Sequence, residues 1–162
     1  MPHYTITSLP EQHFFRVGLR FSHHGSQPVR LSLPNWVPGS YMIREFARHI
    51  IRIEASCNGQ AAGLQAVSKN IWQAEENTPG DWLIEYDVHA FDLSVRGCYL
   101  DSERAFFDGA ALFFQVACSG IFGSLAGGVV EAHGFPFVRY RKSAPLPPRP
   151  TPPCIGSWFN LL

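Results

Sequence analysis

The chain has 162 residues, which is enough for one domain with a single hydrophobic core and a tail. Its 13 basic and 13 acidic residues cancel, so no net field draws it to nucleic acid or to an acidic membrane surface, and we expect neither as a partner. The opening residues, MPHYTITSLPEQHFF, lack the basic and then apolar pattern of a secretory signal, which predicts a cytoplasmic protein.

Four segments alternate apolar and polar residues with a period of two. They begin near Phe14, Val29, Ile50 and Asp81. This pattern is typical of strands with one face in a core and the other in water. The side chains that we expect in the core are Phe15, Val17, Leu19, Phe21, Leu31, Leu33, Ile51, Ile53, Trp82, Ile84, Tyr86 and Val88.

Turn signals separate these segments. They are Gly25, Pro38-Gly39, Asn58-Gly59 and Pro79-Gly80. Short strands divided at such intervals predict an all-β fold, either an antiparallel β-sandwich or a curved double sheet, with short helical or irregular corners.

The first unusual segment is LPNWVPGSYMIREFARHI, residues 33–50, which lies between two predicted strands. Its Pro-Gly pair favours a tight turn. The apolar residues that follow recur at helical spacing, with Ser40 as a candidate N-cap, so one or two helical turns or an extended corner would both fit. Trp36, Tyr41 and Phe46 would then plug one end of the core, unless the segment has a functional role.

The second unusual segment, AFDLSVRGCYLDSERAFFDGAALFFQV, covers residues 90–116. Its two ends resemble strands, whereas charged residues crowd its middle. Such a loop is either a solvated face with its own ion pairs or a polar surface that docks a neighbouring domain or receives a peptide.

Sequence motifs for catalysis or metal binding are missing. The chain has seven histidines but no H-E-x-x-H, and four cysteines but no C-x-x-C. It also has no nucleophile elbow and no phosphate-binding loop. We therefore predict no catalytic residue, no metal ligand and no cofactor in this chain, and we interpret Cys57, Cys98, Cys118 and Cys154 as free thiols.

Taken together, the two unusual segments resemble the N-terminal domain of the glycyl aminopeptidase family of zinc metallopeptidases. The likeness covers about residues 4–116 and rests on the W-x-P-G-S-Y-x-I-R-x-F-A-R run, the V-R-x-x-Y-L-D run and the R-x-F-F-x-G run. It implies an N-terminal all-β domain followed, in a longer protein, by a thermolysin-like catalytic domain that binds zinc through H-E-x-x-H, and often by a PDZ domain.

The resemblance also implies a function for the longer protein. A zinc-activated water would attack the peptide carbonyl next to an N-terminal glycine or alanine, with a glutamate as general base. This chain would be the non-catalytic accessory domain, which packs against the catalytic domain in cis and helps to shape the cleft for a peptide substrate. Zinc would be held in the catalytic domain of the parent.

Both unusual segments should then lie at one end or face of the sheet. Arg44, Arg48 and Arg96 should find partners among Glu45, Asp92, Asp101 and Glu103, because charges in a packed corner need counter-charges. The residues that we predict for the surface facing another domain or the substrate are Trp36, Tyr41, Arg44, Arg48, Arg96, Tyr99, Asp101 and Arg104.

The C-terminal part departs from the family pattern. We predict a β domain over residues 1–118 and an atypical Gly/Pro-rich tail over residues 119–162, which holds seven of the 13 prolines in its last 27 residues. A truncated product, a separate domain or a frame-shifted end would each explain it. Its stretch PLPPRPTPP, residues 145–153, is either a linker or a polyproline II ligand.

Two alternatives to the peptidase domain remain open from the sequence. One is a stand-alone β-sandwich that acts as a binding module. The other is a membrane-tethered protein, because residues 109–130 are uncharged and long enough to span a bilayer.

Overall fold

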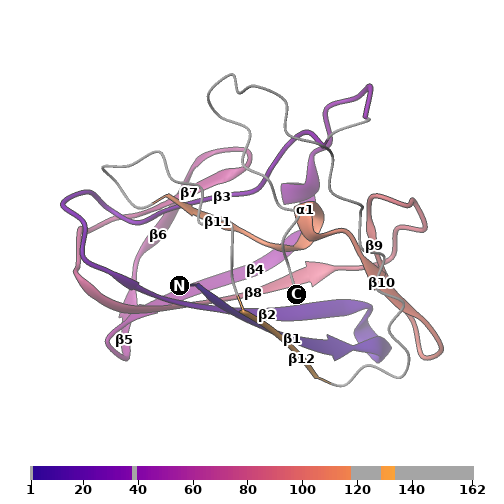
Figure 1. Cartoon of the computed structure of the whole chain (residues 1–162), viewed down its shortest axis with the longest axis horizontal. Coiled ribbons are helices and arrows are strands. Elements are labelled where there is room, and N and C mark those ends of the chain that lie inside the picture. The colour runs from indigo at the N-terminus through magenta and orange to yellow at the C-terminus, as the bar shows by residue number, and fades with distance from the viewer. Residues whose placement is uncertain (1, 38–39, 118–128, 134–162) are drawn as a thin grey trace.

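Six strands form the larger sheet of the protein, in the order β12-β1-β2-β8-β4-β5. The computed structural model describes residues 2–37, 40–117 and 129–133 (Figure 1). Every described pair of neighbours in this sheet is antiparallel except β1 and β12, which run parallel. The strands of the larger sheet are β1 (His3–Leu9), β2 (Phe14–His23), β4 (Ile50–Cys57), β5 (Gln60–Ala62), β8 (Gly80–His89) and β12 (Val129–His133).

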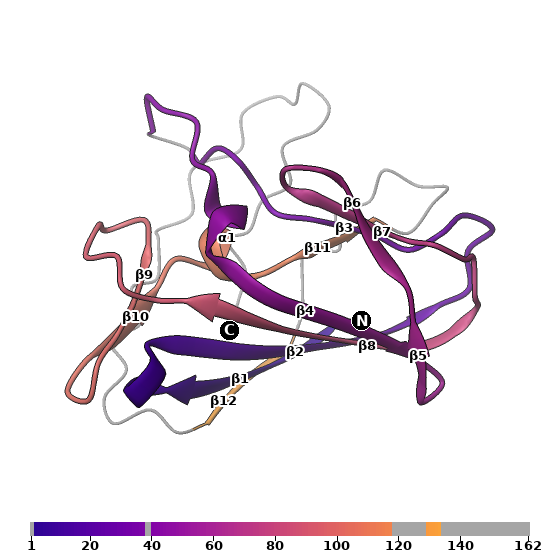
Figure 2. The same ribbon diagram turned by 180° about the vertical axis from the view of Figure 1, so that it is seen from behind.

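A second sheet of four strands lies over the larger one, as Figures 1 and 2 both show, in the order β11-β3-β7-β6. A hairpin of β9 and β10 stands at the end of the molecule where the 3-10 helix η2 and the short helix α1 also lie. The expected all-β antiparallel sandwich is confirmed. The remaining elements are β3 (Arg30–Ser32), β6 (Leu64–Ser68), β7 (Ile71–Ala74), β9 (Cys98–Leu100), β10 (Ala105–Phe107), β11 (Gln115–Ala117), η1 (Pro10–Gln12), η2 (Phe46–His49) and α1 (Gly109–Leu112).

The core lies between the two sheets and follows the predicted alternation. Ten of the twelve predicted core side chains are buried, among them all four from β2 and all four from β8. The ring of Phe114 contacts both sheets. It packs edge-on against Tyr86 of β8 and Trp72 of β7, with ring centroids 4.7 and 5.1 Å apart, respectively. Burying large apolar side chains in this way fixes which face of each strand points inward.

The prediction for Ile51 is wrong, and Ile53 is only half-buried. The pairing of β4 with β8 shifts between Ile50 and Arg52, so that Ile51 is an extra residue on β4. Such a β-bulge puts one residue out of the period-two pattern. Ile50 therefore packs against the core, whereas the Ile51 side chain is 58% exposed.

The segment after β10 also differs from the expected strand. Residues Gly109–Leu112 form α1, because the carboxylate of Asp108 accepts a hydrogen bond from the backbone N–H of Ala110 at 2.9 Å and so caps a helical turn. Only Gln115–Ala117 is a strand. Two tyrosine hydroxyls hold the segment between α1 and β11 in place. Tyr86 donates a hydrogen bond to the carbonyl of Leu112 at 3.0 Å, and Tyr4 donates one to the carbonyl of Phe114 at 2.7 Å.

The stretch 109–130, read as a membrane-span alternative, begins as α1 and β11. Across the part of the chain that the structure describes, no helix has the length and apolar character needed to cross a bilayer. From the segment predicted as a tail, Val129–His133 joins the larger sheet as β12. The boundary at 118 and the Pro-rich stretch 145–153 lie outside the described residues and remain predictions.

Candidate functional site

Two loops lie beside η2 at the same end of the molecule (Figures 1 and 2). The first loop, residues 33–45, connects β3 to η2, and its residues 38–39 lie outside the described part. The second loop, residues 90–97, connects β8 to β9. Both belong to the segments that the sequence analysis marked as unusual.

The first loop is closed by its own hydrogen bonds. The indole N–H of Trp36 donates to the carbonyl of Ser40 at 2.9 Å, and the backbone N–H of Arg44 donates to the carbonyl of Asn35 at 2.7 Å. Ser40 is buried and its hydroxyl bonds to the backbone of Met42 rather than capping a helix. Of the two structures left open for this segment, the irregular corner is therefore correct up to residue 45, and the helical turn is limited to η2.

The second loop is shaped by an Asp turn. The carboxylate of Asp92 accepts a hydrogen bond from the backbone N–H of Ser94 at 2.8 Å, and this bond is the main reason why the pKa of Asp92 is lowered. Gly97 lies against the same carboxylate, and a Cβ atom there would come within 2.7 Å of the Asp92 side chain. Only glycine fits this close approach.

The two loops are linked through η2. The charges of His49 and Arg48 lie near enough to Asp92 to lower its pKa further. The His49 ring stacks on the His89 ring of β8 with centroids 6.4 Å apart, and burial, followed by repulsion from Arg48, lowers the pKa of His49. The end of the sheet and both loops thus form one continuous surface.

This surface carries most of the exposed large apolar side chains. The described residues include nine such side chains, and eight of them lie on the two loops or on the neighbouring bulge, with Val67 as the ninth. Exposed apolar side chains gathered in one place mark a surface that binds another body, whereas single ones are ordinary. We call this set the two-loop surface: Trp36, Tyr41, Met42, Ile43, Ile51, Phe91, Leu93 and Val95.

The site residues predicted from the sequence surround this surface. Trp36 and Tyr41 belong to it, Arg44 and Arg48 follow them along the chain, and Arg96 lies on the second loop. The other three meet at the β9–β10 hairpin: the hydroxyl of Tyr99 donates to Asp101 at 2.9 Å, and Nε of Arg104 lies 3.9 Å from the same carboxylate.

The charge pairing at this end agrees with the predicted scheme only in part, since Arg48 lies near Asp92 and Glu45 but the direct ion pairs are others. Glu45 pairs with Lys69 of the loop between β6 and β7, at 2.8 Å, and Arg48 donates to the ring of His49 at 3.1 Å. Nε of Arg44 is buried without a hydrogen-bond partner among the described residues. Arg96 lies near Asp108, whose pKa is raised by burial and lowered to a lesser extent by this guanidinium.

Sequence reasoning missed six members of the two-loop surface, namely Met42, Ile43, Ile51, Phe91, Leu93 and Val95. The last three alternate along the chain and so looked like the inward face of a strand. The signal against a strand was the Asp92 to Gly97 stretch, whose Asp, Ser and Gly favour a turn.

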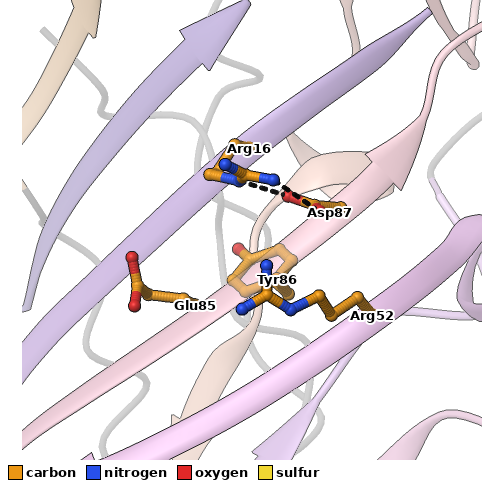
Figure 3. A pocket seen from close by; sticks show the side chains of 5 residues that line it. All are labelled: Arg16, Arg52, Glu85, Tyr86 and Asp87. Carbon is orange, nitrogen blue, oxygen red and sulfur yellow. Dashed lines mark hydrogen bonds and ion pairs between the residues drawn. The ribbon is translucent and has the colours of Figure 1, made fainter. Parts of the chain in front are cut away.

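A shallow polar hollow of about 120 Å³ lies on the outer face of the larger sheet. Figure 3 shows its lining, in which the guanidinium of Arg16 faces the carboxylate of Asp87 with bonds of 2.8 and 3.0 Å. This hydrogen bond and the charge of Asp87 raise the pKa of Arg16. Arg52, on the other side of the hollow, pairs with Glu54 of the same strand. Three of the five lining residues, Arg16, Asp87 and Arg52, are thus held in ion pairs. Few of the charged groups in the hollow are therefore available to act on a substrate.

Within the described residues, no three His, Cys, Asp or Glu side chains are arranged to hold a metal ion. The side chains of this part of the chain therefore do not fit a catalytic zinc, and we route no step of a hydrolysis through them. Cys57 and Cys98 are buried free thiols, as expected, and burial raises the pKa of both. Cys118 and Cys154 lie outside the described residues.

Comparisons with known proteins identify a family and a similar structure for this chain. The family model of the peptidase M61 N-terminal domain matches residues 3–119. Among solved structures, the chain is similar to an aminopeptidase N family protein from Idiomarina loihiensis, with 35% sequence identity and a TM-score of 0.71. The similarity covers 82% of this chain but 22% of that protein, so the chain spans about a fifth of the length of this relative. No curated protein matches the chain.

Proposed function

This chain belongs to the peptidase M61 family, and we propose that it acts as the non-catalytic N-terminal β domain of a zinc metallo-aminopeptidase. The observation that carries the proposal is the match of residues 3–119 to the N-terminal domain of a peptidase family, in a chain that spans 22% of a longer aminopeptidase relative. The hydrolysis itself, its zinc and its preference for N-terminal glycine or alanine belong, in this proposal, to a catalytic domain in cis.

The contact with that catalytic domain is made by the two-loop surface. Each large apolar side chain contributes about 1.5–3 kcal/mol when it moves from water to a buried site. Covering even part of this surface would favour a fixed position of the two domains. Two domains of the same chain lose little translational freedom when they pack together, because they are already linked. A modest contact surface is therefore sufficient to hold them in a fixed position.

The charged residues around this surface have a second role in the proposal. Arg44 and Arg96 on the loops, Arg48 on η2, and Asp101 with Arg104 on the hairpin form a polar rim. Interfaces commonly place charges at such a rim, where they set orientation rather than affinity. The part of the rim not covered by the catalytic domain would form one wall of the cleft for the peptide.

The first experiment tests whether the chemistry lies elsewhere. The purified chain is dialysed against a mild chelator, its zinc content is measured, and glycyl and alanyl chromogenic amides are assayed with and without added zinc. We expect no stoichiometric zinc and no turnover. Chelator-resistant zinc at one ion per chain, or turnover that disappears in His89→Ala or His133→Ala, would overturn the proposal.

The second experiment tests the docking surface in the intact Idiomarina relative. A photo-crosslinking amino acid is placed at the positions that superpose on Ile43 and Leu93, and at the position of Val67 as a matched control on the other sheet. We expect crosslinks to the rest of that chain from the first two positions and none from the third. Crosslinks only from the control position would contradict the docking surface while leaving the family assignment intact.

A cytoplasmic location is also part of this proposal. It is supported by the free thiols of Cys57 and Cys98, since disulfides are typical of oxidising compartments. Fractionation of cells that produce the chain would test it, and recovery with an envelope or secreted fraction would contradict it.

A further inference from the structure

The outer edge of β1 is covered by a strand that lies beyond the family domain. The family match ends at residue 119, whereas β12 covers Val129–His133. The pair has a continuous register from His3 opposite Val129 to Thr7 opposite His133. It is also the one parallel pair among the described strands.

The side chains described for residues 130–133 of β12 make few contacts with the rest of the domain. Val130 is partly buried and packs against the core, whereas Glu131, Ala132 and His133 are exposed. Opposite Ala132, Ile6 of β1 is fully buried. Among the side chains described for residues 130–133, Val130 is the one that packs against the core, and the backbone ladder with β1 supplies the rest of the attachment.

A polar cluster of Glu131, His3 and His133 also links β12 to β1. The carboxylate of Glu131 lies 3.4 Å from Nε2 of His3 on β1 and 4.0 Å from Nε2 of His133 on its own strand. A carboxylate at this position of an incoming strand thus meets an imidazole of β1. The strand that lies on this edge thus carries an apolar residue, Val130, followed by an acidic one, Glu131.

An edge of this kind offers a row of unpaired backbone donors and acceptors when it is open. We propose that the outer edge of β1 is a strand-binding site, which β12 occupies in this chain and from which it can be exchanged for an extended peptide with an apolar-acidic pair. Main-chain hydrogen bonds supply the affinity in such strand addition, and alternate side chains supply the specificity. The domain formed by residues 3–119 keeps its fold when β12 leaves.

The test uses the full chain with Val130→Pro, which removes a backbone donor and the buried side chain of β12. The matched control is Val67→Pro on β6, an edge strand of the other sheet, at a position where the pairing register already shifts. Hydrogen exchange is followed for the amides of β1, β2 and β8. We expect Val130→Pro to speed exchange at β1 about tenfold or more, with β2 and β8 unchanged, and Val67→Pro to leave all three unchanged.

The probe is the synthetic peptide Gly-Val-Val-Glu-Ala-His-Gly. It should bind Val130→Pro, restore slow exchange at β1, and bind wild type at least tenfold more weakly because β12 competes. Replacing its Glu by Lys should weaken binding about tenfold. Unfolding of the whole domain in Val130→Pro, unchanged β1 exchange in that variant, or equal binding of a scrambled peptide would each overturn the proposal.

Discussion

The outer face of the larger sheet and the two-loop surface both face solvent, but they satisfy their side chains in opposite ways. On the sheet, Arg16 pairs with Asp87 and Arg52 pairs with Glu54, so the charges find partners within the domain. On the two-loop surface, seven large apolar side chains of the loops and Ile51 of the β4 bulge are exposed to solvent. The charged groups of the sheet are thus paired within the domain, whereas the apolar side chains of the two-loop surface are left for the neighbouring domain that we propose.

The largest effect should come from the core between the two sheets, in contrast to the two-loop surface. Phe114 is fully buried and contacts both sheets, so Phe114→Ala should lower the free energy of unfolding by about 3–5 kcal/mol. Leu93→Ala, on the surface itself, should change it by less than about 0.5 kcal/mol. Urea unfolding measures both. Equal losses would mean that the loop side chains belong to the core and not to an interface.

A smaller effect should come from breaking the half-buried ion pair of Arg16 and Asp87 on the sheet. Arg16→Met leaves the carboxylate of Asp87, a residue only 6% exposed, without its guanidinium. We expect a loss of about 1–2 kcal/mol, a modest figure because water reaches the Arg16 side and screens the pair. Arg16→Met with Asp87→Asn should recover part of it. A double variant that is less stable than Arg16→Met would contradict this reason.

The pH dependence of stability should depend on the loop end rather than on the sheet. Burial lowers the pKa of His49 below its usual value, so the unfolded chain binds a proton more readily than the folded one. Stability should therefore fall as the pH drops below about 6.5 towards the folded pKa. His49→Gln should flatten the slope between about pH 7 and 5.5. Thermal unfolding at several pH values measures it, and an unchanged slope in the variant would exclude His49 as the cause.

The smallest effect is expected at the exposed pair on the sheet. Arg52 and Glu54 are both largely exposed, and a pair of this kind contributes little in water. Glu54→Gln should leave the unfolding temperature unchanged within error, at low salt and at high salt. A clear drop in the unfolding temperature at low salt alone would show that the exposed charges of the outer face also contribute to the stability of the sheet.

Much of the fold was predictable because the strands of the larger sheet have one buried and one wet face. Phe15 to Phe21 and Trp82 to Val88 follow strict alternation, and all their inward residues are buried. Ile51 broke this rule because a bulge is a pairing event between two strands, which a single segment does not reveal. The helix α1 depends on the local Asp108 cap and on the complete burial of Leu112, and only the burial is a tertiary effect that the segment alone does not reveal.

The candidate site was predictable only in position. Both unusual segments were identified, and Trp36 and Tyr41 proved to lie on the two-loop surface. The apolar members of the second loop were not found, because an exposed Leu93 or Val95 looks the same in sequence as a buried one. The partner of Glu45 was missed as well, since Lys69 is distant along the chain and reaches it only through the fold.

The bulge at Ile51 bears on how such a domain can acquire a partner. The extra residue, Ile51, faces solvent, and the pairing of β4 with β8 resumes at Arg52 and continues to Cys57. An exposed apolar side chain is therefore added to the surface while the core side chains of the strand keep their places. Insertion at the end of a strand is a route by which a domain gains surface for a neighbour at little risk to its own folding.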